Sequence, residues 1–329
     1  MLVRAVVVTE PGGPEQLQIV DRPAPEPGPD DVLVAVRATS VNGADLLQRK
    51  GGYPPPEGAT DILGLEAAGE VVEVGDRVTS YAVGDRVCGL LPGGGYAEFA
   101  VLPAGLVLPL PDQVDWTPAG GLAEVFATAH DNMLTRARLT AGETVLIHGI
   151  ASGVGTAATQ LAVRAGARVL GTASTEAKRR AAEDLGADAT IDYTSEDFVD
   201  RVDELTEGRG VDVVLDIVGG PYLQRNLDVL ALEGRLVVVS VIGGPQAELS
   251  LRQLMVRRLT ITASTLRARS VEEKTAVSDA LRRDVLPGFA DGSLRVVVDS
   301  VHDLDHVADA HRALEAGTHV GKVIVRVGG

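Results

Sequence analysis

The most informative run in this chain reads Thr144-Val-Leu-Ile-His148-Gly-Ile-Ala-Ser-Gly153-Val-Gly155-Thr-Ala-Ala-Thr-Gln-Leu-Ala162. Its apolar residues 145–147 predict a short strand that is buried on both faces. A glycine-rich turn follows, and then a segment with helical periodicity, 154–165, which Gly166 ends. Small residues let the backbone approach a pyrophosphate, and a helix N-terminus offers it free N–H groups. The run therefore predicts a strand, turn and helix that bind phosphate.

The glycine turn departs from the strict pattern G-x-G-x-x-G. If Gly155 is the last glycine of that pattern, Ile150 and Ser152 occupy its first two glycine positions. Short glycine matches are common by chance, so an ordinary strand-to-helix turn is the alternative. The neighbouring sequence is needed to choose between them.

The chain alternates between strands and helices from about residue 121 to residue 264. After the opening strand, further strands are expected at 168–172, 189–192, 211–216, 234–239 and 259–264. Helices are expected between them at 176–185, 195–206, 222–230 and 251–257. Six strands alternating with helices predict a doubly wound parallel sheet, which binds ligands at the carboxyl ends of its strands. This context favours the phosphate-binding interpretation of the turn.

The rest of the chain predicts a second fold type. Short apolar or alternating runs recur at 17–20, 32–38, 69–74, 86–91 and 96–101, separated by Pro and Gly clusters. This density of strands and turns is typical of a compact barrel. After residue 265 we expect helices at 270–283 and 303–315 and strands near 295–299 and 320–327. The predicted organisation is α/β, with domains at 1–120 and 121–264, and with 265–329 returning to the first.

Composition narrows the functional class. The net charge of −16 disfavours nucleic-acid binding, which needs basic surface against phosphates. No run reaches the roughly 18 apolar residues of a membrane span, and the first residues lack a secretory pattern. Cys88 is the only cysteine, which argues against disulfides and cysteine zinc clusters. A cytoplasmic location is expected by default. Only four residues are lysines, Lys50, Lys178, Lys274 and Lys322, so the placement of each is informative.

Several motifs occur in one order along nearly the whole chain: Val41-Asn-Gly-Ala-Asp45-Leu, Ile62-Leu-Gly-Leu-Glu66-Ala-Ala-Gly69, Gly84-Asp-Arg-Val87, Ser152-Gly-Val-Gly155, Asp216-Ile-Val-Gly219-Gly and Gly321-Lys-Val-Ile-Val325. In these motifs the chain resembles the zinc-independent quinone oxidoreductases of the medium-chain dehydrogenase/reductase superfamily. The run from Asn42 to Pro56 is most similar to the NADPH:quinone reductases. The resemblance implies a GroES-like β-barrel catalytic domain and a Rossmann domain with a doubly wound parallel six-stranded sheet.

The same resemblance predicts that the chain holds no metal. Zinc alcohol dehydrogenases of the superfamily have Cys where Asn42 stands and Gly-His-Glu where Gly64-Leu65-Glu66 stands. An amide and a leucine cannot replace thiolate and imidazole ligands, and the cysteine-rich structural zinc lobe is missing. His302 and His306 are four residues apart on an expected helix but have no third ligand. An exposed helix face is the simpler interpretation of this pair.

The resemblance also implies NADP as the cofactor. NAD enzymes usually place an acid at the end of the second strand, where it binds the ribose 2′-hydroxyl; none occurs at 171–175. The family's contacts to the 2′-phosphate side carry over to Ser174, Lys178 and Tyr193. A solvated lysine and an edge tyrosine are the alternatives for the last two. Glu176 does not fit, because its charge would oppose a nearby phosphate.

The implied contacts to the rest of the dinucleotide come from both domains. They are Ser152, Gly153, Val154 and Gly155 in the turn, with Asn42, Tyr53, Thr128, Ile242, Gly243, Thr265 and Leu266 towards the nicotinamide. Asn42 and Tyr53 are the expected catalytic residues, because both can hydrogen-bond the nicotinamide end or the acceptor oxygen. For Tyr53, packing on residues 54–56 is the alternative. Asp45 is expected to cap a helix at 46–50.

Without a Lewis-acidic metal, which supplies several kcal/mol, a simple ketone is a poor partner. The sequence therefore predicts hydride transfer from NADPH to a quinone. Reduction of an enone, alkenal or enoyl thioester is the alternative, and a non-catalytic nucleotide-binding protein is a third hypothesis. We expect a small-molecule substrate, no nucleic-acid or membrane partner, and a homodimer that pairs through the strand at 259–264.

Overall fold

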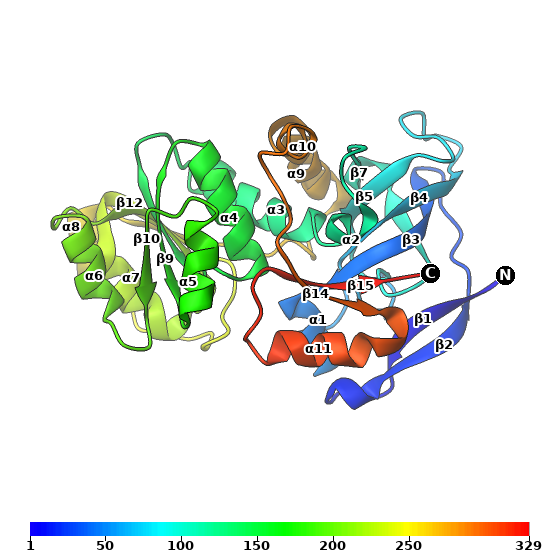
Figure 1. Ribbon diagram of the computed structural model, residues 1–329, viewed down its shortest axis with the longest axis horizontal. Coiled ribbons are helices and arrows are strands. Elements are labelled where there is room, and N and C mark those ends of the chain that lie inside the picture. The colour runs from blue at the N-terminus through cyan, green and yellow to red at the C-terminus, as the bar shows by residue number, and fades with distance from the viewer. Residues whose placement is uncertain (329) are drawn as a thin grey trace. The chain divides into compact units, whose positions relative to one another are not determined.

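The structure is a computed structural model that describes residues 1–328, and it divides into two units. One unit contains Met1–Ala127 together with the chain from Leu266 onward, and the other contains Thr128–Thr265. We call them the catalytic unit and the nucleotide unit and describe each by itself (Figure 1).

The nucleotide unit contains one parallel sheet of six strands in the order β10-β9-β8-β11-β12-β13. The strands are β8 (Thr144–His148), β9 (Arg168–Ala173), β10 (Ala189–Asp192), β11 (Val211–Asp216), β12 (Leu230–Val238) and β13 (Thr260–Ala263). Numbered from β8, this is the Rossmann order 3-2-1-4-5-6, which reverses direction beside β8. The prediction of a doubly wound parallel sheet is confirmed, and the glycine turn follows the strand at the reversal point.

The helices of this unit are α4 (Gly153–Arg164), α5 (Glu176–Glu183), α6 (Phe198–Leu205), α7 (Leu223–Val229) and α8 (Leu251–Arg257), with a 3-10 turn at Gly220–Tyr222. The predicted strand residues Val145, Leu146 and Ile147 are fully buried, as a central parallel strand requires. A π-helix at His130–Arg136 was not predicted from the sequence. Such helices are rare and leave no periodic signal, although they often lie at functional sites.

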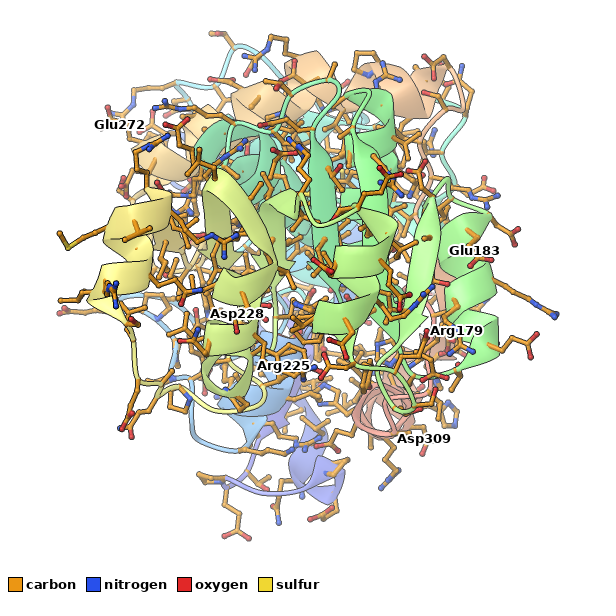
Figure 2. All side chains as sticks on the ribbon, turned by 90° about the vertical axis from the view of Figure 1, so that its left-hand side faces the viewer. Arg179, Glu183, Arg225, Asp228, Glu272 and Asp309 are labelled. Carbon is orange, nitrogen blue, oxygen red and sulfur yellow. The ribbon has the colours of Figure 1, made fainter. Side chains whose placement is uncertain are left out.

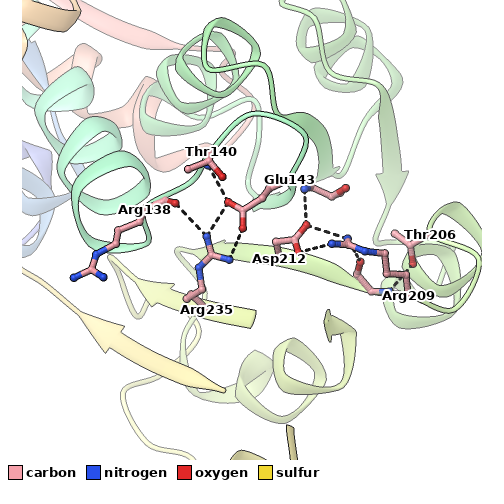
Figure 3. Close-up of polar contacts among 9 residues, drawn as sticks. Arg138, Thr140, Glu143, Thr206, Arg209, Asp212 and Arg235 are labelled. Atoms are coloured by element: carbon pink, nitrogen blue, oxygen red, sulfur yellow. Dashed lines mark hydrogen bonds and ion pairs between the residues drawn. The ribbon is translucent and has the colours of Figure 1, made fainter. Parts of the chain in front are cut away.

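A polar network closes the amino-terminal ends of β8, β11 and β12 (Figure 3). Arg235 donates to both carboxylate oxygens of Glu143, at 2.7 and 2.9 Å, and to the carbonyl oxygens of Ala137 and Arg138. Asp212 accepts from the backbone N–H of Thr144 at 2.8 Å and from Arg209. The network joins the starts of β8, β11 and β12 to each other and to the chain just before β8, so we expect it to stabilise the sheet.

Glu143→Gln should lower the free energy of unfolding by about 1 to 2 kcal/mol, because a partly buried two-point ion pair is lost. Burial raises the pKa of Glu143, but hydrogen bonds from Arg235 and Thr140 outweigh it and hold the pKa below its ordinary 4.5. This contribution is therefore present above about pH 4.5 and is lost as the pH falls below it. Thermal unfolding across this range measures both effects. Glu176→Gln, which breaks an exposed pair with Arg180, should change little; equal losses would contradict the assignment.

The catalytic unit is built on β3 (Asp31–Val41), an eleven-residue strand with three antiparallel partners. Its first half pairs with β6 (Phe99–Pro103), its second half pairs with β15 (Lys322–Arg326), and β4 (Glu66–Val74) runs along it. The other strands are β1 (Leu2–Val8), β2 (Leu17–Pro23), β5 (Arg86–Leu90), β7 (Val107–Pro109) and β14 (Val298–Asp303). The starts of β4 and β15 therefore lie on either side of the end of β3.

Two expectations for the C-terminal part of the chain were wrong. The strand expected at 295–299 is β14, Val298–Asp303, and the helix expected from residue 303 begins as a 3-10 turn before α11. His302 therefore lies on a strand and His306 in the turn, so they do not share a helix face. A further helix, Leu286–Ala290, was not expected, because Pro287 and Gly288 form helices poorly.

The helices of the catalytic unit are α1 (Gly43–Arg49), α2 (Trp116–Ala119), α3 (Ala123–Ala129), α9 (Val271–Asp284), α10 (Leu286–Ala290) and α11 (Val307–Glu315). The 3-10 turns are Pro14–Gln16, Ala104–Leu106 and Leu304–His306. Within residues 1–328, no helix combines the length and apolar character needed to cross a membrane.

Candidate functional site

The glycine turn is held in shape by its serine and its last glycine. The Ser152 hydroxyl accepts from the N–H of Gly155 at 3.0 Å and so caps α4. A Cβ atom on Gly155 would lie 2.4 Å from the carbonyl oxygen of Gly149 and 2.5 Å from that of Ile150. Gly153 and Val154 occupy the first turn of α4, where the helix supplies no acceptor for their N–H groups. Ser152 thus serves as an N-cap where the strict pattern has glycine, and the cradle fits a pyrophosphate.

His148 fixes the strand end just before this turn. Its Nε2 donates to Asn226 Oδ1 at 2.7 Å, so its Nδ1 accepts from the Thr172 hydroxyl at 3.0 Å. Burial lowers the pKa of His148 to about 4, so the ring is neutral at pH 7. The ring packs edge-on against Phe198, and the guanidinium of Arg225, which is labelled in Figure 2, lies over the Phe198 ring. His148 is therefore a support for the turn, a role that its place in the sequence did not reveal.

Ser174 and Lys178 lie where β9 ends and α5 begins. Thr175 caps this helix by accepting from the Lys178 N–H at 3.3 Å, and no acid occurs between residues 171 and 175. Arg180 forms an ion pair with Glu176, whose negative charge would oppose the 2′-phosphate of NADP. This pairing offsets the charge of Glu176. Tyr193 follows the adjacent strand β10 and is exposed. Beside it, Arg179 pairs with Asp192 at 2.7 Å (Figure 2). Ser174, Lys178 and Tyr193 thus all follow the carboxyl ends of the neighbouring strands β9 and β10.

Asn132 of the π-helix links Thr128 to Ser264, the neighbour of Thr265; both threonines are predicted near the nicotinamide. The Asn132 amide donates to the carbonyl of Thr128 at 2.8 Å and accepts from the hydroxyl of Ser264, beside Thr265, at 2.7 Å. Ile242 and Gly243 lie in the loop after β12. The Gly243 N–H donates to Val218 at 2.9 Å, and the Ile242 side chain is 74% exposed. Ile242, Gly243 and Thr265 therefore follow the carboxyl ends of β12 and β13, and Thr128 lies beside the π-helix through Asn132.

A buried ion pair occupies the catalytic unit where β3, β4 and β15 meet. Lys322 Nζ lies 2.7 Å from Asn42 Oδ1 and 3.1 Å from Glu66 Oε1, and Lys322 and Glu66 are only 3% and 1% exposed. The Glu66 carboxylate also accepts from the Ser40 hydroxyl, the Asn42 amide and the backbone N–H of Glu124. Asn42 is thereby fixed in one orientation, with its amide oxygen turned to an ammonium group.

These residues do not fit a zinc ion. Asn42, Leu65 and Glu66 offer one carboxylate, and that carboxylate is already paired with the Lys322 ammonium group. Burial raises the pKa of the Cys88 thiol, which disfavours the thiolate that zinc binds. Within residues 1–328, no three His, Cys, Asp or Glu side chains form a metal-binding group.

Tyr53 is held by an arginine that the sequence analysis did not single out. Arg267, 6% exposed and next to the predicted residue Leu266, donates to Gln48 Oε1 and to the carbonyl of Pro92, both at 2.7 Å. Its guanidinium carbon lies 5.4 Å from the centre of the Tyr53 ring. Burial raises the pKa of the Tyr53 phenol, although Arg267 opposes this. The phenol is therefore protonated at neutral pH and can donate a hydrogen bond.

Asp45 has a structural role, as expected, but it does not cap a helix at 46–50: α1 begins at Gly43, Asn42 is its N-cap, and Asp45 is the third residue of the helix. Its carboxylate accepts from the backbone N–H of Asn42 at 2.8 Å and from that of Gly64 at 3.1 Å, in the first turn of α1. Burial raises the pKa of Asp45 to about 6, although these hydrogen bonds oppose it. Its place in the site is to hold the backbone beside Asn42.

Comparisons with known proteins place the chain among oxidoreductases. Residues 28–112 match the alcohol dehydrogenase GroES-like domain, and residues 153–282 match the zinc-binding dehydrogenase model. The chain is 32% identical to a quinone oxidoreductase of Mus musculus over 327 residues, 98% of each protein. It is 42% identical to a quinone oxidoreductase of Pseudomonas aeruginosa over 199 residues, 60% of this chain and 61% of the relative. That match thus spans less than two thirds of the Pseudomonas protein.

Two solved structures are similar along almost their whole length. The quinone oxidoreductase of Escherichia coli in complex with NADPH has a TM-score of 0.87 and 31% identity, covering 98% of this chain and 99% of that one. The CurK enoyl reductase has a TM-score of 0.88 and 28% identity, covering 99% of each chain.

Proposed function

Because the chain belongs to the quinone oxidoreductase branch of the medium-chain dehydrogenase/reductase superfamily, we propose that it transfers hydride from NADPH to a quinone. The Lys322 ammonium group between Asn42 and Glu66 is the observation that carries this proposal. It occupies the region where zinc members have ligands, so no ion is available to polarise a simple carbonyl. An acceptor that takes hydride without such help is required, and quinones are of this kind.

When bound, the reduced nicotinamide supplies the hydride. In the nucleotide unit, the first-turn amides of α4 would bind the pyrophosphate, and Thr128, Ile242, Gly243 and Thr265 would contact the nicotinamide end. In the catalytic unit, Leu266 and Asn42, which Lys322 and Glu66 fix, would orient the ring, and Tyr53 would donate its phenolic hydrogen bond to the acceptor oxygen. The protein thus contributes mainly proximity and orientation.

We propose that Lys178 selects NADPH over NADH. Lys178→Ala should raise KM for NADPH by about tenfold, because one charge-assisted contact to a phosphate is lost at a partly exposed site. KM for NADH should stay within about twofold, since NADH has no 2′-phosphate. Steady-state kinetics with both nucleotides measures this difference. Lys50→Ala, which removes an exposed lysine of the catalytic unit, is the control; equal effects on both nucleotides would refute the assignment.

Reduction of a conjugated C=C bond is the second candidate, and the similarity to the CurK enoyl reductase supports it. NADPH and NADH should each be tested with 1,2-naphthoquinone, an alkenal and crotonyl-CoA under matched conditions. We expect NADPH with the quinone to give the highest kcat/KM. A higher value with the alkenal or thioester would favour the second candidate. Nucleotide binding without turnover of any acceptor would favour a non-catalytic protein.

We also propose a cytoplasmic homodimer. β13 is one of the two edge strands of the six-stranded sheet, so its outer side can pair with a second copy across a twofold axis. Light scattering that gives the mass of one chain would contradict the dimer.

A further inference from the structure

A chain of side-chain hydrogen bonds leads to Asp45 through the interior of the catalytic unit. Arg49 Nη1 lies 3.2 Å from His311 Nδ1, and His311 Nε2 lies 3.2 Å from the hydroxyl oxygen of Tyr96. The Tyr96 hydroxyl in turn lies 3.3 Å from Asp45 Oδ2. All four side chains are fully buried. The mechanism above uses none of them, although the chain ends at the carboxylate that bonds the backbone of Asn42.

The chemistry of Arg49 gives these hydrogen bonds one direction. A guanidinium group can only donate, so His311 Nδ1 accepts from Arg49 and the ring proton lies on Nε2. Nε2–H then donates to the Tyr96 oxygen, which leaves the phenolic hydrogen to donate to Asp45. Burial, and next the nearby charge of Arg49, lower the pKa of His311 to about 3, so the ring is neutral at pH 7. Each group thus orients the next, and the Asp45 carboxylate is the last acceptor.

The far end of the chain is anchored between two helices. Arg49, at the end of α1, donates through Nη2 to Glu315 Oε1 at 2.6 Å and through Nε to the carbonyl of Gly12 at 3.0 Å. His311 and Glu315 are four residues apart on α11, so they lie on one face of that helix. The packing of α1 on α11 therefore fixes the orientation of the His311 ring.

At its other end, the chain reaches both segments that hold Lys322. The Asp45 carboxylate accepts from the backbone N–H of Asn42 at 2.8 Å and from that of Gly64 at 3.1 Å. Asn42 is one partner of the Lys322 ammonium group, and Gly64 lies two residues before the other partner, Glu66. The position of the Asn42 side chain thus depends on an Asp45 carboxylate that is ionised and correctly turned.

We propose that Tyr96 and His311 are positioning residues for hydride transfer: they orient the Asp45 carboxylate, which holds Asn42 in place. This inference rests on the proposed function. Arg49 does not give up its proton, so the chain cannot carry protons inward from the surface, and its role is orientation. Orientation matters because a displacement of about 1 Å at a reacting centre can lower a rate about 100-fold.

The ionisation of Asp45 gives this role a signature in the pH profile. Charged or titratable groups of the neighbouring elements act on Asp45 or on Tyr96: Lys322 on β15, Arg267 before α9, Glu124 on α3, Glu66 on β4, Arg49 on α1 and His311 on α11. Burial outweighs the opposing hydrogen bonds and positive charges and raises the pKa of Asp45 to about 6. A protonated carboxyl group carries a hydrogen where one of its donors must bind. We therefore expect kcat to fall as the pH falls through about 6.

Tyr96→Phe tests the proposal in NADPH oxidation with 1,2-naphthoquinone. It should lower kcat about tenfold at pH 7 and leave both KM values within about twofold, because orientation is lost and binding groups remain. The lost donor should also raise the pKa of Asp45 and move the acid limb of the profile up by about one pH unit. Tyr81→Phe is the matched control, since its hydroxyl donates to the carbonyl of Val107 at 2.6 Å in the same unit. It should lower the melting temperature by a similar amount but change neither kcat nor the limb.

Two substitutions of His311 separate orientation from packing. The amide of His311→Gln can accept from Arg49 and donate to Tyr96, so this variant should keep more of the rate than His311→Leu, which can do neither. Equal kcat values in the two variants would overturn the role of His311. Tyr96→Phe with the wild-type acid limb, or with a kcat within about twofold of wild type, would overturn the role of Tyr96.

A measurement on the nucleotide-free protein needs no activity. In ¹⁵N NMR spectra of protein with labelled histidine, His311 should be the Nε2–H tautomer and should stay neutral down to about pH 5. Its signal is the one that His311→Gln lacks. An Nδ1–H tautomer would contradict the direction of the chain. A wild type that fails to oxidise NADPH with the quinone would instead remove the proposed function, whatever tautomer the spectra show.

Discussion

Lys322→Met should lower the free energy of unfolding by about 3 to 5 kcal/mol, because it leaves the Glu66 carboxylate buried without a counter-charge. Glu66 is 1% exposed, and its other partners, Ser40, Asn42 and the Glu124 backbone, are neutral. Thermal and denaturant unfolding would measure the loss. This is a large part of the 5 to 15 kcal/mol or so that typically holds a folded domain.

A double variant separates two contributions to the loss of stability: the uncompensated charge of Glu66 and the lost packing of the Lys322 side chain. Lys322→Met combined with Glu66→Gln should recover at least about half of the loss, since a neutral amide needs no counter-charge. Lys50→Met is the matched control, because Lys50 pairs with Glu315 at an exposed site and should cost less than about 1 kcal/mol. If Lys322→Met proves as mild as Lys50→Met, the buried pair is not the anchor of the catalytic unit.

Gly155→Ala should weaken NADPH binding about 100-fold and lower stability by about 1 to 3 kcal/mol. The added methyl group would lie 2.4 and 2.5 Å from two carbonyl oxygens of the turn, and backbone atoms cannot rotate away as a side chain can. The turn must therefore open, which moves the first-turn amides of α4 from the phosphate. Fluorescence titration with NADPH, together with thermal unfolding, measures the two losses.

Gly43→Ala is the matched control for this substitution. Gly43 also lies in the first turn of a helix, and a Cβ there has nothing within 4 Å. It should leave nucleotide affinity unchanged and stability equal or slightly higher. Should Gly155→Ala bind NADPH as tightly as Gly43→Ala does, the turn is not the phosphate cradle.

The nucleotide unit could be predicted well because its signals are local. The apolar run at 145–147, the glycine turn and the helix after it lie within about twenty residues, and each has its own periodicity or breaker. The structural role of Asp45 was predictable for the same reason, since its carboxylate accepts from a backbone N–H three residues away, although the start of the helix was placed three residues too late. By contrast, β14 was misplaced, because its bounds depend on pairing with β15, about twenty residues further along the chain.

The ion pair and its surroundings could not be assembled from the sequence. Lys322 lies 280 residues from Asn42, and Arg267 lies 219 residues from Gln48. Only the strand order of the folded catalytic unit brings such residues together. One signal was available: lysine is scarce in this chain, and two of the four lysines, Lys274 and Lys322, prove to be buried. Buried lysines are uncommon unless they are paired with an acid or a hydrogen-bond acceptor. The small number of lysines in this chain was therefore a reason to examine each one for such a partner.

The most direct measurement is the rate of NADPH oxidation by chelator-treated protein with 1,2-naphthoquinone, using NADPH with and without deuterium at C4. We expect that the chelator does not reduce turnover, because hydride transfer needs no metal. We also expect that deuterium slows turnover, because the C4–H bond breaks in this step. No oxidation of NADPH, no effect of deuterium in a single turnover, or activity that chelation removes and zinc restores would contradict metal-free hydride transfer.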